Sequence, residues 1–291
     1  MNRNFLNKSK NINKKNLILS AAFGYNWNEL KVFIKSLRNF SNCRTILIVD
    51  NKIDTETEKK LSFFKIEIFK YLKKDSDKPG LSNNRSDIGQ RRYGMYEHVL
   101  KKIIKKPKII CLTDSRDVVF QEDIFKIKYK KKINFFLEEE KILNDNRNKR
   151  WLIRTVGKDK YDKIKNNYIS CSGTTIGHYK EILRYSSLMK RKLNIYLYKL
   201  PLRHRLLLKK IEPYDQGLHN YLIYNNFFKN KKIHKNNTSK ICTTAFMKKF
   251  SFNKKKQLIN VKGKIYSLIH QYDRPINKLG KPIFKFNKIY E

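Results

Sequence analysis

Short apolar runs alternate with stretches of helical spacing between Asn16 and Asp114. The runs predict buried strands, and the stretches between them, with apolar residues recurring every three or four positions, predict amphipathic helices. The predicted strands are Asn16–Tyr25, Arg44–Asp50, Lys65–Tyr71 and Lys108–Thr113, and the predicted helices are Asn28–Phe40, Thr55–Phe64 and Asp87–Lys106. This alternation predicts an α/β fold with a doubly wound, mostly parallel central sheet that is flanked by helices.

Small or acidic residues come at the ends of three of these predicted strands. Gly24 closes the first, Asp50 the second and Asp114 the fourth. In open parallel sheets, ligands bind beyond the carboxyl ends of the strands. The sequence therefore predicts a binding site at this edge of the sheet.

Acids are informative in this chain because they are rare. The 291 residues include 67 Lys or Arg against 25 Asp or Glu, which gives a formal charge of +42. Four acids nevertheless fall within ten residues directly after the fourth predicted strand: Asp114, Asp117, Glu122 and Asp123. One interpretation is a turn that closes the strand. The other is a site for Mg²⁺ or Mn²⁺, with carboxylate ligands that leave coordination positions open for substrate phosphates.

The positive charge itself does not indicate a nucleic-acid-binding surface. It is spread almost evenly along the chain, and 52 of the 67 basic residues are lysines. Arginine, whose planar fork contacts bases and phosphates in a bidentate manner, contributes only 15. Motifs that define other nucleotide-binding or hydrolytic sites (GxGxxG, GxxxxGK[ST], HExxH and GxSxG) do not occur. A bound nucleotide would have to be held by a metal and individual side chains.

Four segments, in this order, resemble the GT-A-fold glycosyltransferases, which use nucleotide-diphospho-sugars. Thr113–Gln121 (TDSRDVVFQ) is similar to their DxD region, in the form D-x-R-D followed by an aromatic residue. Ser172–Gly177 resembles the small-residue strand that faces the sugar, and Tyr214–Asn220 resembles the Asp-Gln segment that opens a helix beside the acceptor. His270–Arg274 matches the place of a late histidine that completes the metal site.

The polar, basic composition of residues 1–16 predicts a flexible tail. The resemblance implies that residues 17–291 form a single GT-A-like domain. Residues 17–121 would form the nucleotide-binding half. Residues 122–291 would form the acceptor-side half, which includes a helical insert at Asn144–Lys165 and ends in a segment that contacts the metal and the diphosphate.

The resemblance also implies a set of site residues. Asp114, Asp117 and His270 would hold Mn²⁺ or Mg²⁺. The nucleotide-sugar would contact Gly24, Tyr25, Asp50, Arg92, Ser172, Gly173, Gln216 and Arg274. Asp215 would be catalytic, as a general base if configuration is inverted, or as a group that positions the sugar if it is retained.

Each of these assignments has a purely structural alternative. His270 would then be a hydrogen-bonded histidine at a strand end, and Asp215 would cap the helix Gln216–Tyr224. Ser172 and Gly173 would permit close packing, and Arg92 would belong to a solvated helix face.

The expected function is transfer of a sugar from a nucleotide-diphospho-sugar to a saccharide, lipid-linked or other hydroxyl acceptor, as in polysaccharide biosynthesis. One alternative is a sugar nucleotidyltransferase, although the Gly-rich, basic signature usual near the N-terminus of such enzymes is missing. The other is a non-catalytic, basic nucleic-acid-binding protein, in which the acid cluster would have no function. No specific nucleic-acid partner is expected.

The expected location is the cytoplasm. No apolar stretch is long enough to span a bilayer, the N-terminus lacks a secretory segment, and the four cysteines form no CxxC pair. Tyr196–Ile211 combines apolar residues with five bases. The favoured interpretation of this segment is a helix or loop that packs its leucines on the core. The alternative is that the segment makes peripheral contact with the anionic inner face of a membrane.

Overall fold

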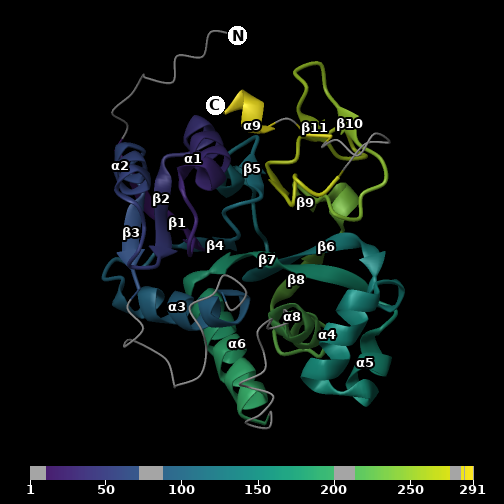
Figure 1. The fold of residues 1–291 in the computed structure, drawn as a ribbon. Helices are drawn as coiled ribbons and strands as arrows, with labels where there is room; N and C mark the ends of the chain where they lie inside the picture. The colour runs from purple at the N-terminus through teal and green to yellow at the C-terminus, as the bar shows by residue number, and fades with distance from the viewer. Residues whose placement is uncertain (1–10, 72–87, 200–213, 276–282, 285, 291) are drawn as a thin grey trace.

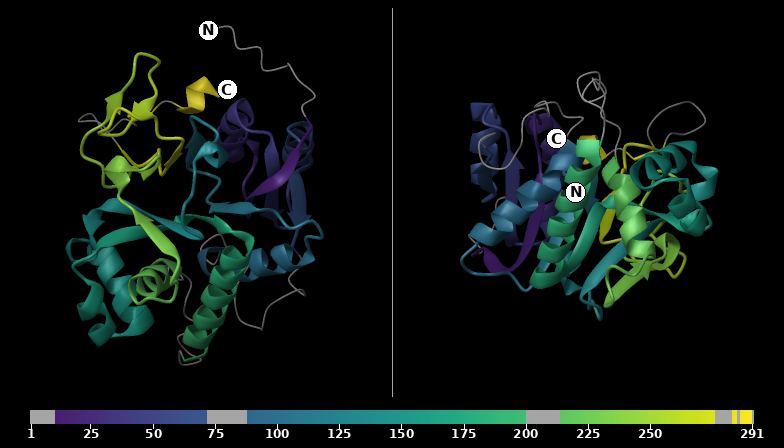
Figure 2. Two further views of the ribbon diagram at one scale, coloured as in Figure 1. Left: turned by 180° about the vertical axis from the view of Figure 1, so that it is seen from behind. Right: turned by 90° about the horizontal axis from the view of Figure 1, so that it is seen from below.

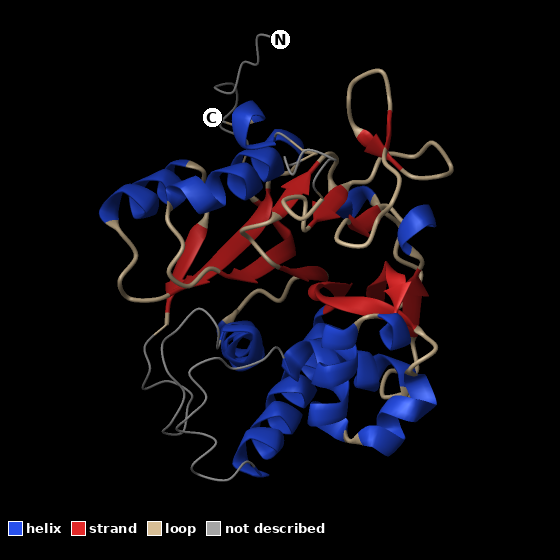
Figure 3. Cartoon of the chain, turned by 45° about the vertical axis from the view of Figure 1, so that its right-hand side comes forward, coloured by secondary structure: helices blue, strands red, loops and turns tan. Residues whose placement is uncertain are grey.

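The computed structural model describes residues 11–71, 88–199, 214–275, 283–284 and 286–290 (Figure 1). Its centre is a seven-stranded sheet with the strand order β3-β2-β1-β4-β7-β6-β8. A three-stranded sheet, β5-β12-β9, and a two-stranded sheet, β10-β11, lie to one side of it, as the colouring by secondary structure shows (Figure 3).

The strands of the central sheet are β1 (Asn13–Ala21), β2 (Cys43–Val49), β3 (Glu67–Lys70), β4 (Ile109–Thr113), β6 (Ile133–Lys141), β7 (Tyr168–His178) and β8 (Lys231–His234). The smaller sheets contain β5 (Val118–Phe120), β9 (Ile241–Thr243), β10 (Ser251–Phe252), β11 (Leu258–Ile259) and β12 (Leu268–His270). The helices are α1 (Trp27–Phe40), α2 (Thr55–Phe63), α3 (Ile88–Lys102), α4 (Asn146–Val156), α5 (Lys158–Ile164), α6 (Tyr179–Lys199), α8 (Tyr214–Tyr224) and α9 (Phe286–Ile289).

The central sheet is mostly parallel, as the sequence predicted. β1 pairs in parallel with β2 and β4, β2 with β3, and β6 with β8. Only β7, of the strands in this sheet, runs against its neighbours, since it is antiparallel to both β4 and β6. We call the edge at which the parallel strands end the carboxyl edge, and the edge at which they begin the amino edge.

Helices cover both faces of the sheet, and each face has its own core. In β1, Leu17 and Leu19 pack into the core under α3, α6 and α8, whereas Ile18 packs into the core under α1. Strands that are buried on both faces read as continuous apolar runs, which is the pattern seen in the sequence. α3 and α6 lie side by side on one face (Figure 2), where Tyr93 and Tyr185 meet edge to face.

The helices between the strands have the local signals that such helices need. At α1, the side chain of Asn26 accepts a hydrogen bond from the Glu29 backbone, and the Glu29 side chain accepts one from the Asn26 backbone. This capping box pairs backbone donors that would otherwise be unsatisfied at the helix start. The apolar face of α1, with Leu30, Phe33 and Leu37, then packs on the sheet.

The first strand begins earlier than the sequence predicted. We expected a basic tail up to residue 16 and a strand from Asn16, but β1 starts at Asn13. Asn13 pairs with Cys43 of β2, and Asn16 pairs with Ile109 of β4. Backbone pairing with strands on both sides therefore outweighs the polar, lysine-containing composition of this stretch.

The small sheet brings the late part of the chain against the turn that follows β4. In β12, His270 lies opposite Val118 of β5. The amide of Gln121, just after β5, donates to the carbonyls of Leu258 and Tyr266 and accepts from the backbone N–H of Leu258. These buried hydrogen bonds fix the segment of β11 and β12 beside β5, so that His270 faces the β4–β5 turn.

Candidate active site

Two carboxylates lie in the turn between β4 and β5. The backbone N–H of Asp114 donates to the carbonyl of Gly173 in β7, at 2.9 Å, which extends the β4–β7 pairing by one residue beyond Thr113. Asp117 comes directly before β5, and it is buried. The turn therefore holds both acids at the carboxyl edge of the sheet.

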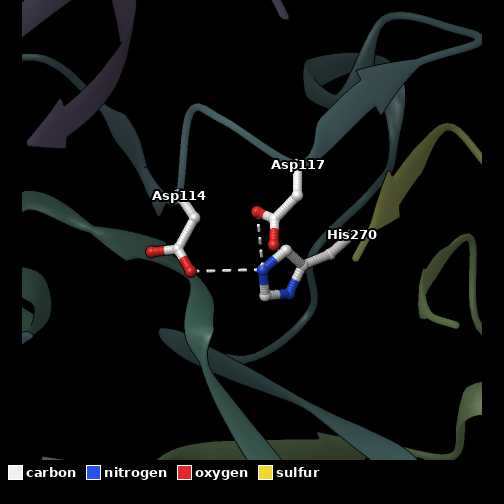
Figure 4. Close-up of side chains that lie close together, drawn as sticks. All are labelled: Asp114, Asp117 and His270. Atoms are coloured by element: carbon white, nitrogen blue, oxygen red, sulfur yellow. Dashed lines mark hydrogen bonds and ion pairs between the residues drawn. The ribbon is translucent and has the colours of Figure 1, made fainter. Parts of the chain in front are cut away.

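His270 completes a cluster with these two acids (Figure 4). Its Nε2 lies 3.2 Å from Oδ2 of Asp114 and 3.5 Å from Oδ1 of Asp117. One ligand atom from each of the three residues lies within 4.8 Å of the others, close enough for one ion to contact all three. Two carboxylates and an imidazole are a ligand set that suits Mn²⁺ and, with more water in the coordination shell, Mg²⁺.

Gly173 leaves the space that this cluster occupies. A Cβ atom at position 173 would lie 2.3 Å from Cε1 of His270 and 2.7 Å from Oδ2 of Asp114. Any other residue would push apart the histidine and the first carboxylate. The predicted glycine is therefore required by the close approach of β7 to the three candidate metal ligands, and the residues present fit a divalent cation.

Arg92 connects this cluster to Asp215. From α3, its guanidinium donates one hydrogen bond to Asp114 and another to Oδ2 of Asp215, the latter at 2.7 Å. The same Nη2 also lies 3.1 Å from Oγ of Ser172. Arg92 is buried, so it is not part of a solvated helix face. It holds the two carboxylates in a fixed relation across the site.

The charges in this group shift one another's pKa values. Burial alone would raise the pKa of Asp114, but the Arg92 guanidinium and His270 outweigh it and hold that pKa well below its usual range. The pKa of Asp215 is raised, because the effect of burial exceeds the opposing effect of the Arg92 guanidinium. The pKa of His270, which burial alone would lower, is raised by Cys171 and by the carboxylates of Asp117 and Asp114.

A cavity of about 550 Å³ opens beside the cluster. Of the residues that the sequence predicted, Tyr25, Arg92, Asp114, Asp117, Ser172, Gly173, Asp215, Gln216 and Arg274 line it. Arg274 and Arg116 approach it from the side of Asp117, at 3.6 Å and 3.3 Å from Oδ2 of that residue. Segments that lie far apart in the sequence therefore meet at one concave site.

Asp215 and Gln216 belong to the first turn of α8 rather than to its cap. The helix begins at Tyr214, and the Asp215 carboxylate is bound by Arg92 and Ser172. The Gln216 amide accepts from the backbone N–H of Ser172 and donates to the carbonyl of Ser170. Gln216 thus ties α8 to β7, which fixes Asp215 beside the cavity.

Gly24 and Asp50 do not line the cavity. Oδ2 of Asp50 accepts a hydrogen bond from the Gly24 backbone N–H at 2.6 Å, and Oδ1 accepts one from the backbone of Lys52. Gly24 has a φ of 63°, in the left-handed region that favours glycine. These residues join the turns after β1 and β2, and their expected contact with a nucleotide stays a prediction.

Several cavity residues were missed by the sequence interpretation. Glu138 of β6 is buried, and burial raises the pKa of its carboxyl to about 7. Cys171 of β7 has its Sγ 3.4 Å from Nδ1 of His270. Arg147, Asn148 and Trp151 line the cavity from α4. This helix lies within the insert Asn144–Lys165, whose expected place on the acceptor side stays a prediction.

The remaining expectations from the sequence fall partly outside the described structure. Of the basic segment Tyr196–Ile211, the first four residues end α6, and residues 200–213 are not described. Among the described helices, none has the length and apolar character needed to cross a membrane. The four cysteines are all free and buried.

Comparison with known proteins supports the fold of this chain. No protein-family model matches the sequence. No curated protein matches it either. Among solved structures, the chain is similar to the glycosyltransferase GlyE of Streptococcus pneumoniae TIGR4, with a TM-score of 0.50 and 13% identity. The match covers 96% of this chain and 59% of that one. The protein therefore has a mixed α/β fold, with a mostly parallel seven-stranded sheet, that is similar to a glycosyltransferase structure.

Proposed function

We propose that this chain is a metal-dependent glycosyltransferase that moves a sugar from a nucleotide-diphospho-sugar to a hydroxyl acceptor. The observation that supports the proposal best is the cluster of Asp114, Asp117 and His270 beside a cavity at the carboxyl edge of the sheet. The likeness in fold to a glycosyltransferase is consistent with it. In this proposal, the fold is of the GT-A type and the D-x-R-D turn serves as its DxD motif.

The three clustered residues would hold Mn²⁺ or Mg²⁺ and so bind the donor through its diphosphate. When bound, the cation would neutralise the negative charge that develops on the leaving nucleoside diphosphate. Arg274 and Arg116 would donate hydrogen bonds to the same phosphates, because both side chains line the cavity beside Asp117. Tyr25, which lies on the cavity wall after β1, would contact the nucleoside.

Asp215 is the carboxylate that we propose for catalysis. It lies on the cavity wall with Ser172 and Gly173, where the transferred sugar would bind. Its raised pKa favours acceptance of a proton from the attacking hydroxyl if the reaction inverts configuration. If configuration is retained, the carboxylate would position the sugar and stabilise its developing positive charge. Arg92 keeps the side chain in place in both cases.

Binding of the donor can be tested by thermal unfolding with UDP- and GDP-sugars, with and without Mn²⁺. We expect one nucleotide class to raise the Tm, and only when Mn²⁺ is present, because the proposal has the donor bound through the metal. A ligand at 100 times its Kd adds about 2.7 kcal/mol to the free energy of unfolding. Asp117→Asn should abolish the shift. Asp159→Asn, on the exposed surface of α5, should leave it unchanged. A shift of equal size in EDTA, or none with any nucleotide-sugar, would contradict the metal-dependent proposal.

A further inference from the structure

Five lysines gather at the amino edge of the sheet, at the opposite end of β4 from the cavity. Lys14 and Lys15 lie in β1, and Lys105, Lys106 and Lys108 lie in the connection from α3 to β4. With Ile12 and Asn13, they line a recess of about 580 Å³, which we call the lysine recess. Lys108 comes directly before β4 and Asp114 directly after it, so the recess and the cavity are separated by the length of that strand, about 17 Å.

The backbone holds this group of charges together. The N–H of Lys108 donates to the carbonyl of Lys15 at 2.7 Å, which joins the two segments at the start of the β1–β4 pairing. The amino group of Lys106 lies 5.5 Å from the ring centroid of Tyr179, at the start of α6. Two of the lysines therefore lie in β1, the other three lie in a connection that is hydrogen-bonded to β1, and all five side chains are exposed.

No carboxylate neutralises these five lysines within the described residues. The lining of the recess contains no acid, and none of the five forms an ion pair in the described part of the chain. Lys131 and Lys132 extend the basic surface, because the backbone N–H of His178, opposite Ile109, donates to the carbonyl of Lys132. Like charges at this density repel one another, and a surface of negative charge would relieve that repulsion.

The composition of the chain alone does not account for this arrangement. Five of the eight residues from 101 to 108 are lysines. By contrast, none of the described residues that line the cavity is a lysine. Lysines thus gather at the recess and are absent from the described lining of the cavity, although they are spread evenly along the sequence.

An exposed isoleucine lies directly before two of these lysines in the chain. Ile104, in the turn between α3 and β4, is 98% exposed and directly precedes Lys105 and Lys106. An exposed aliphatic side chain among lysines is unfavourable in water. It suits the interface of an anionic bilayer, where the apolar group enters the headgroup region and the lysines contact phosphates. Nucleic acid would satisfy the lysines but would leave Ile104 without an apolar partner.

We propose that the lysine recess and Ile104 form a docking surface for an anionic lipid bilayer. This surface is distinct from the segment Tyr196–Ile211 and does not depend on the proposed enzymatic function. Because the cavity lies at the opposite edge of the sheet, docking would hold its opening away from the lipid headgroups. The surface would then tether the protein and leave the cavity accessible to substrates from the aqueous side.

The experiment is flotation of the full chain with vesicles of phosphatidylcholine alone or mixed 7:3 with phosphatidylglycerol. We expect binding only to the anionic vesicles, and its loss at high salt, because exposed charges are screened. Combined Lys105→Glu, Lys106→Glu and Lys108→Glu should lower the partition coefficient about 100-fold. Ile104→Ser should lower it roughly fivefold. The matched control reverses the charge of Lys52, Lys59 and Lys160, which are exposed on other elements.

The control should retain most of the binding, and thermal unfolding should show that all variants are folded. Equal loss in the control and in the recess variant would overturn the proposal, because it would show a non-specific effect of net charge. Full binding by Ile104→Ser would also overturn it, as would binding to duplex or single-stranded nucleic acid without binding to anionic vesicles.

Discussion

At the scale of single residues, arginine and lysine occupy separate places in this protein. The chain has 52 lysines and 15 arginines. Yet the described residues that line the cavity include four arginines, Arg92, Arg116, Arg147 and Arg274, and no lysine. Arginine remains charged when buried, and its planar fork binds two carboxylate or phosphate oxygens at once. Arg92 uses this geometry to hold Asp114 and Asp215 together.

Cys171 lies behind the candidate metal ligands and provides a prediction at the same scale. When Nε2 of His270 faces a metal, Nδ1 carries the hydrogen, and the Cys171 sulfur 3.4 Å away can accept a hydrogen bond from it. Groups behind metal ligands typically contribute 10–100-fold to metal affinity. We expect Cys171→Ala to weaken Mn²⁺ binding about tenfold in titration calorimetry, and Cys171→Ser to restore part of the loss.

Cys242→Ala is the matched control, because Cys242 is a buried thiol in β9 that does not line the cavity. It should leave the Mn²⁺ affinity unchanged. If Cys171→Ala binds Mn²⁺ as tightly as wild type does, the thiol has no role in positioning His270.

The sequence predicted the site acids because acids are scarce, and this signal has a clear limit. Asp114, Asp117 and Asp215 stood out beside short motifs, and the structure brings them to one cavity. Glu138 did not stand out in the sequence, because Glu139 and Glu140 follow it and nothing in the run distinguishes one glutamate from the next. Only the pairing of β6 with β7 decides which of the three is buried beside Cys171.

At the scale of elements, local patterns predicted the first four strands and the helices between them to within a few residues. They did not predict that β7 runs against its neighbours. Strand direction depends on pairing between distant segments, here Thr113 with Thr174, and no local property of the strand encodes it. The same reversal brings Gly173 opposite Asp114, so the least predictable feature of the sheet contributes to the site.

Gly94 in α3 provides a prediction for one helix. A Cβ atom there would lie 3.6 Å from the nearest atoms of Lys190, an ordinary van der Waals contact. Since glycine in a helix interior costs roughly 0.5–1 kcal/mol relative to alanine, Gly94→Ala should raise the free energy of unfolding by about that amount. Denaturant unfolding would measure it, with the Mn²⁺ affinity unchanged.

Gly177→Ala in β7 should have the opposite effect. Its Cβ would lie 2.7 Å from the carbonyl oxygen of Lys132, so the backbone of two paired strands would have to shift. If Gly94→Ala instead destabilises the protein, Lys190 of α6 does not leave room for a Cβ atom in α3.

At the scale of the whole molecule, acidic and basic side chains gather at opposite edges of the central sheet, although the basic residues are evenly spread in sequence. Asp114, Asp117, Glu138 and Asp215 meet at the cavity, at the carboxyl edge. Five lysines that form no ion pair with any described residue meet at the amino edge, in the lysine recess. The folded chain thus separates a group of carboxylates at one edge of the sheet from a group of lysines at the other. Composition gave the net charge but could not give this separation, which follows from the strand order.

The most direct test of the proposed function is release of nucleoside diphosphate from the nucleotide-sugar that binds. We expect release with Mn²⁺, its loss in EDTA and its recovery when Mn²⁺ is restored. Asp215→Asn should bind the donor as wild type does and lower the rate at least 100-fold, because a positioned proton acceptor contributes about that much. Release that continues undiminished in EDTA, or that is unchanged in Asp215→Asn, would contradict the assignment of this cavity as a metal-dependent glycosyltransferase site.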